Sequence, residues 1–205
     1  MHRGEIFNSV THLVGSVFAL AGLALLIVLG VRSRNPWLLT GYAVYGTSLL
    51  LLYLFSTLYH SVSGRAKRVF RKLDHTSIYV LIAGTYTPFA LVPLRGRGGI
   101  GLLVVVWLLA AGGIAQEFVL PRRLEALSIA LYLLMGWLAL AVVGPMSEAL
   151  GWAAMGWVFA GGLLYTTGVV FYVLDEKMAH SHGVFHLFTL AGSAIHYFVI
   201  VSKIR

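Results

Sequence analysis

The chain has 205 residues, 59% hydrophobic and 11% charged, against about 45–50% and 25% in typical soluble domains. The small number of charged side chains excludes an ordinary soluble domain, and the high content of apolar residues excludes a disordered chain. The lack of cysteine excludes disulfides, thiolate nucleophiles and cysteine metal sites. The net charge of +8 in so apolar a chain indicates contact with a membrane face and no nucleic-acid partner.

Apolar runs of about 20 residues between charged breaks predict an all-α membrane protein with seven membrane-spanning helices. These runs cover roughly residues 9–30, 38–59, 76–93, 100–118, 126–143, 152–174 and 184–201. The breaks are short, and Gly144-Pro145 is predicted to separate the fifth run from the sixth. Because no linker or low-complexity stretch interrupts the chain, residues 1–205 are predicted to form a single seven-helix transmembrane domain.

Basic residues in the loops predict the orientation of this bundle. The side that holds the N-terminus carries nine of them: Arg3, Arg65, Lys67, Arg68, Arg71, Lys72, Arg122, Arg123 and Lys177. The opposite side carries six: Arg32, Arg34, Arg95, Arg97, Lys203 and Arg205. Since basic loops stay in the cytoplasm, we expect a cytoplasmic N-terminus, an external C-terminus and a location in the cell membrane.

Polar side chains gather near the cytoplasmic boundary, beginning with the first run. Glu5, Asn8 and His12 are spaced i, i+3, i+7 and so share one face of a helix. Ionisable groups at membrane depth are costly and mark function by default. A structural capping network and a part of a catalytic site both remain open for these three residues.

The second and third runs add a hydroxyl, an imidazole and a carboxyl at the same depth. Ser56 and His60 are spaced i, i+4 at the end of the second run, and Asp74 precedes the third. The spacing aligns the Ser56 hydroxyl with the His60 ring on one helical face.

The start of the seventh run carries a second histidine pair, His182 and His186, again spaced i, i+4. Zinc proteases share this spacing, but Gly183 stands where their glutamate would be. Three histidines with an open fourth position are typical of a catalytic zinc site, and Asp74 could bind the metal or hold its water. The alternative is that each boundary histidine only makes a local hydrogen bond or faces lipid headgroups. His196, about 15 Å deeper along the helix, is expected to hydrogen-bond across the bundle.

Four ordered motifs together resemble the progestin and adipoQ receptor family, and specifically its bacterial hemolysin III branch. They are Glu5-x2-Asn8-x3-His12, Ser56-x3-His60, Lys72-Leu-Asp74 and Ser181-His182-x3-His186. The resemblance covers nearly the whole chain and implies a seven-helix fold with a cytoplasmic N-terminus. It also implies a zinc ion near the cytoplasmic face, bound by His60, His182 and His186, with Asp74 contacting it through water and Ser56 beside it.

The wider superfamily includes alkaline ceramidases, which implies that the chain hydrolyses a lipid amide or ester and serves membrane lipid homeostasis. In that scheme Asp74 takes the proton of the attacking water, and Ser56 donates a hydrogen bond to the oxyanion or the substrate. One alternative is a sensor or receptor in which zinc is only structural. The other is a pore-forming haemolysin, as the branch name suggests, although the sequence has no long amphipathic segment.

Overall fold

The computed structural model describes residues 5–120 and 124–205 as a bundle of helices, with no strand in those two ranges. The helices are α1 (Ile6–Ser33), α2 (Pro36–Ser61), α3 (Gly64–Leu91), α4 (Gly99–Val119), α5 (Glu125–Gly136), α6 (Val143–Leu150), α7 (Trp152–Val173) and α8 (Ser181–Lys203). A 3-10 helix, η2 (Trp137–Val142), joins α5 to α6. The all-α prediction is confirmed.

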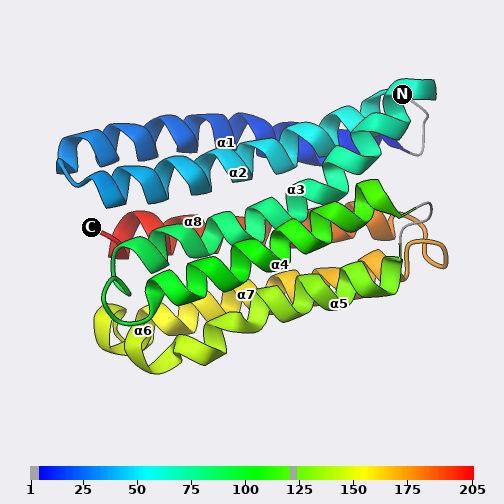
Figure 1. The fold of residues 1–205 in the computed structure, drawn as a ribbon. Coiled ribbons are helices and arrows are strands. Elements are labelled where there is room, and N and C mark those ends of the chain that lie inside the picture. Colours follow the sequence, from blue (N-terminus) through cyan, green and yellow to red (C-terminus); the bar gives the residue numbers. More distant parts are fainter. Residues whose placement is uncertain (1–4, 121–123) are drawn as a thin grey trace.

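Among the described residues, six segments are long and apolar enough to cross a membrane, namely α1, α2, α4, residues Glu125–Leu150, α7 and α8. The predicted third span, residues 76–93, lies in α3, which begins twelve residues before that span, at Gly64. Its first turns are basic, and Ser, Thr and Tyr side chains interrupt the rest, so α3 has a lower hydropathy than the other helices. Nevertheless, α3 runs the length of the bundle between α2 and α4 (Figure 1).

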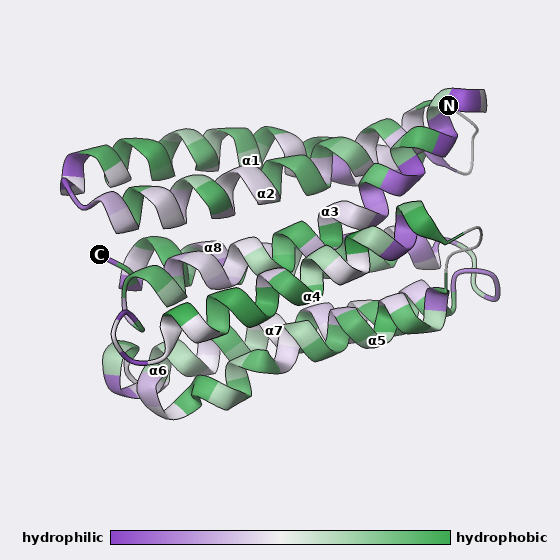
Figure 2. Cartoon of the chain, in the orientation of Figure 1, coloured by the Kyte–Doolittle hydropathy of each residue, from purple (hydrophilic) through white to green (hydrophobic). Residues whose placement is uncertain are grey.

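Hydrophobic residues occupy the middle of the bundle, and hydrophilic residues gather at its two ends (Figure 2). This distribution fits a multi-pass membrane protein, because the hydrocarbon core of a bilayer excludes charged side chains. Of the basic residues that predict the orientation, Arg3, Arg122 and Arg123 lie outside the described residues.

The expected break at Gly144-Pro145 is wrong. Helix α6 continues through both residues, and Pro145 lies in its first turn, where the missing N–H removes no helical hydrogen bond. The chain instead turns at Gly151, whose φ of 83° lies in the left-handed region that glycine adopts without strain.

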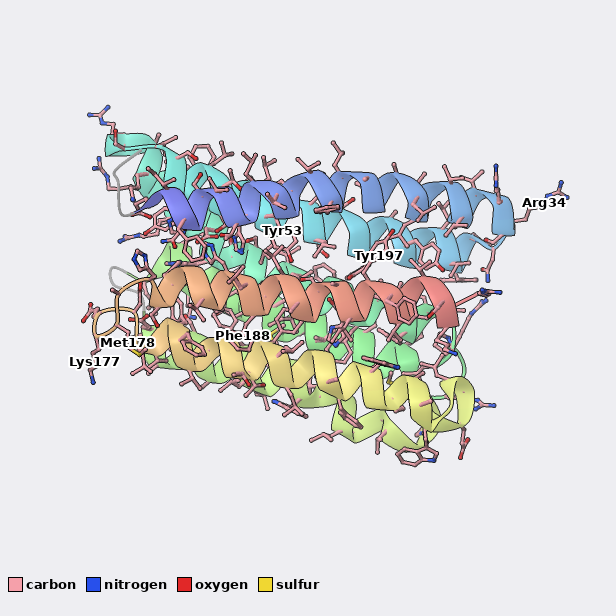
Figure 3. The ribbon with its side chains drawn as sticks, turned by 180° about the vertical axis from the view of Figure 1, so that it is seen from behind. Arg34, Tyr53, Lys177, Met178, Phe188 and Tyr197 are labelled. Atoms are coloured by element: carbon pink, nitrogen blue, oxygen red, sulfur yellow. The ribbon has the colours of Figure 1, made fainter. Side chains whose placement is uncertain are left out.

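The start of α1 and the C-terminus lie at opposite ends of the bundle (Figure 1). Figure 3 likewise places Arg34, after α1, and Lys177, before α8, at opposite ends. Helix α8 packs against α1, α3 and α7, and α2 packs against α1 and α3. The start of α1, the end of α2 and the start of α8 therefore meet at one end of the molecule.

Candidate metal site

Three histidines from two helices converge where these segments meet. His60 lies in the last turn of α2, and His182 and His186 lie one turn apart on one face of α8. One ring nitrogen from each histidine lies within 4.8 Å of those of the other two. His60 and His186 are buried, and His182 is half-buried. The structure thus brings together the three histidines that the sequence spacing singles out.

Glu5, just before α1, fixes the ring of His60. Its carboxylate contacts Nδ1 of His60 and accepts a 2.7 Å hydrogen bond from Nζ of Lys67 on α3. Burial raises the pKa of Glu5, but the hydrogen bonds from Lys67 and His60 outweigh burial and hold that pKa at about 2. An ionised carboxylate only accepts, so Nδ1 of His60 donates and its Nε2 keeps a lone pair.

The other two rings are held in the same way. Nδ1 of His182 lies 3.0 Å from the carboxylate of Asp175 in the α7–α8 loop, which also accepts from the backbone N–H of His182 at 3.2 Å. Nδ1 of His186 lies 3.1 Å from the backbone carbonyl oxygen of Asn8 on α1. Because a carboxylate and a carbonyl oxygen accept hydrogen bonds, both Nδ1 atoms donate and both Nε2 atoms are left for a ligand.

These residues fit a metal ion. Nε2 of His60 is buried and has no hydrogen-bond partner within residues 5–120 and 124–205. Metal-ligating histidines almost always donate their other ring N–H to a carboxylate or a carbonyl, as all three do here. Three imidazole nitrogens suit zinc, with a fourth position left for water or substrate.

His12 packs against this cluster from α1. Its buried ring stacks on that of His186, with ring centroids 3.5 Å apart and planes at 10°, and it meets the ring of Tyr53 edge-on. The residues predicted as one face of α1 thus all reach the site but differ in role. Glu5 and Asn8 bind a histidine ring, whereas His12 covers one.

A cavity of about 170 Å³ adjoins the histidines. Ser56 and Asp74 line it together with His182 and His186. Away from the histidines the lining is mostly apolar and comes from the following residues: Leu52, Ile78, Leu81, Ile82, Phe89, Ile129, Leu133, Met146, Val158, Phe159 and Val169. The cavity therefore has one end that can do chemistry and a long interior that suits a hydrocarbon chain.

Two further residues complete the comparison with the sequence. His196 on α8 lies 3.0 Å from the carbonyl oxygen of Val158 on α7 through Nε2, so the expected hydrogen bond across the bundle is confirmed. Asp175 is absent from the residues predicted as functional. The sequence feature that points to Asp175 is its position seven residues before the histidine pair, in a chain with only seven acidic residues.

Comparison with known proteins gives one consistent family. The family described as Haemolysin-III related matches residues 2–197. The Hemolysin-3 homolog of Bacillus subtilis is 41% identical over 200 residues, covering 97% of this chain and 93% of that protein. Hemolysin-3 of Bacillus cereus is also 41% identical, and the human monocyte to macrophage differentiation factor is 31% identical over 199 residues, or 94% of this chain and 81% of that protein. The family resemblance seen in the motifs is confirmed.

Proposed function

This chain belongs to the Haemolysin-III related family, and on that premise we propose that it is a zinc-dependent hydrolase of a membrane lipid amide or ester. One observation carries the proposal. Three histidines, each with its Nδ1 held by an acceptor, bring one ring nitrogen apiece within 4.8 Å of one another, and His182 and His186 line an apolar cavity together with Asp74 and Ser56.

The site residues divide the chemistry among them. A zinc ion held by His60, His182 and His186 would supply Lewis-acid activation of a water molecule and of the substrate carbonyl. Asp74 accepts the proton of the attacking water, and Ser56 donates a hydrogen bond to the substrate oxygen. The apolar interior binds the acyl chain and keeps bulk water from the reacting end.

The membrane setting agrees with a lipid substrate. We infer that α3 also crosses the membrane, which brings the number of spans to seven. We further infer that the N-terminus and the histidine cluster lie at the cytoplasmic face. The first turns of α3 carry Arg65, Lys67, Arg68, Arg71 and Lys72 at the same end of the bundle as the site. Such a basic segment attracts anionic headgroups to that face of the membrane.

A structural zinc is the second candidate, because His60 and the two histidines of α8 lie on different helices that an ion would cross-link. The name of the Bacillus cereus relative points to haemolysis instead. The largely apolar lining of the cavity argues against an aqueous conduit through one chain.

Single-turnover hydrolysis tests the proposal on ceramide, acyl-amide and phospholipid substrates, with zinc content and melting temperature measured in parallel. Asp74→Asn should keep its zinc and fold but lose roughly 10²–10⁴-fold in rate, because proton transfer by a positioned side chain contributes that much. Ser56→Ala should cost less, near the effect of one hydrogen bond of about 1–3 kcal/mol. No turnover on any substrate, with melting temperature following zinc content, would show that zinc is only structural.

A further inference from the structure

The deep end of the cavity holds a buried acceptor that the proposed chemistry does not use. His196 lines the cavity on α8 and is 9% exposed. Its Nε2 lies 3.0 Å from the carbonyl oxygen of Val158, which can only accept, so Nε2 carries the ring proton. Nδ1 is therefore an acceptor, and it is buried with no partner in the described part of the chain.

No polar group of the described residues lies within hydrogen-bond distance of that nitrogen, and the nearby hydroxyls make other contacts. The hydroxyl of Tyr165 pairs with that of Ser193 at 2.7 Å. The hydroxyls of Thr166 and Tyr86 donate to the carbonyl oxygens of Gly162 and Gly136, both at 2.9 Å. A buried polar atom left without a partner is destabilising, so this acceptor favours a ligand that brings a donor.

The His196 ring is also held in place. A Cβ atom at Gly161 on α7 would lie 2.5 Å from two atoms of that ring, which shows how closely the helix backbone packs against it. Ten residues of helix separate His186 from His196, which sets the two ends of the cavity about 15 Å apart. A fixed acceptor at a fixed distance from the reacting end can select a bound chain that carries a hydrogen-bond donor at one position.

We propose that His196 is a specificity-determining residue whose Nδ1 accepts a hydrogen bond from a hydroxyl group carried along the lipid chain. This inference rests on the proposed function, because it places the lipid carbonyl at the histidine cluster and the chain in the apolar interior. A plain hydrocarbon chain leaves Nδ1 unsatisfied. A chain that carries a hydroxyl about 15 Å from its carbonyl would donate a hydrogen bond to this nitrogen. A hydroxyl at another position would be buried in the apolar interior without a partner.

Displacement of a fluorescent fatty acid from the full, zinc-loaded chain in detergent tests this position by position. The probes are saturated fatty acids of one length, unsubstituted or with a single hydroxyl moved along the chain. For the wild type, affinity should peak at one hydroxyl position, about threefold to tenfold tighter than the unsubstituted acid, as expected for one net hydrogen bond. A flat profile would overturn the proposal and indicate that water satisfies Nδ1.

Two variants assign the peak to the residue. His196→Phe keeps an aromatic ring without an acceptor and should lose the peak, which is measured within the variant as the ratio of its affinities for each hydroxylated acid and for the unsubstituted acid. His196→Gln, whose side-chain oxygen accepts, should keep part of the peak. A peak that survives in His196→Phe would overturn the assignment.

The readout separates this inference from the hydrolase proposal, because it requires no turnover and can be repeated in Asp74→Asn. Hydrolysis without a peak would reject the role of His196 alone. A peak without hydrolysis would reject the hydrolase and leave the hydroxyl subsite standing.

Discussion

At the scale of single residues, hydrogen bonds on one side of each histidine ring determine which ring nitrogen is free to bind a metal. Glu5 and the Asn8 carbonyl lie at the start of α1 and Asp175 lies in the α7–α8 loop, and each receives an Nδ1–H. They fix the tautomer and the ring orientation together, which makes each Nε2 a stronger ligand.

We therefore predict that Asp175→Asn weakens zinc binding. The amide is uncharged and can turn its NH₂ group toward Nδ1, so it holds His182 in the ligand tautomer less firmly than the carboxylate does. Loss of such a partner typically lowers metal affinity about 10–100-fold, which competition with a chelator of known affinity would measure.

Glu176→Gln is the matched control, since it removes a charge from the adjacent exposed residue. It should leave the zinc affinity at the wild-type value. An equal loss in both variants would assign the effect to general loop charge and not to the bond between Asp175 and His182.

The same residues show what sequence spacing can and cannot predict about the site. Helical periodicity places His182 over His186 and groups Ser56 with His60, because it depends only on local geometry. Asn8 contributes a backbone carbonyl, which no side-chain pattern reveals. Asp175 reaches His182 only through the path of the α7–α8 loop, which spacing does not specify.

At the scale of elements, α3 and α4 approach closely at a glycine. A Cβ atom on Gly113 would lie 2.2 Å from the ring of Tyr79, which is fully buried and accepts a 2.8 Å hydrogen bond from Gln116 on its hydroxyl. Gly112, next to it on α4, has nothing within 4 Å of such an atom.

This pair gives a packing prediction within one helix. Gly113→Ala should lower the melting temperature, with a cost of roughly 1–3 kcal/mol for forcing the helices apart. Gly112→Ala should leave it unchanged or slightly raised, because alanine favours a helix by about 0.5–1 kcal/mol over glycine. Thermal melts in detergent measure both, and similar melting temperatures for the two variants would contradict the close approach of α3 and α4.

The helices themselves were the more predictable part of the fold, because long apolar runs determine them directly. The exceptions have local causes. Helix α3 begins well before its apolar portion, because charged residues such as Lys67 can form a helix outside the membrane as readily as a loop. Pro145 resembles a helix breaker in the sequence, but η2 places it in a first turn, where proline is accepted.

At the scale of the whole molecule, the path of the chain predicts its orientation. The start of α1 and the end of α8 lie at opposite ends of the bundle (Figure 1), and the basic first turns of α3 lie at the end that holds the start of α1, so we expect a cytoplasmic N-terminus and an external C-terminus. A reporter fused after Arg205 should be active only if it works outside the cytoplasm, and one inserted after Ser63, between α2 and α3, should show the reverse. Identical behaviour at both positions would contradict the proposed topology.

The central claim is that one zinc ion is held by the three converging histidines. Elemental analysis of the detergent-purified protein tests it most directly. The wild type and His196→Ala should each carry about one zinc per chain, whereas His60→Ala, His182→Ala and His186→Ala should each lose most of it, because two imidazoles alone leave the tetrahedral site half-filled. Full zinc retention in all three of these variants, or a wild type without zinc after purification in its presence, would contradict the claim.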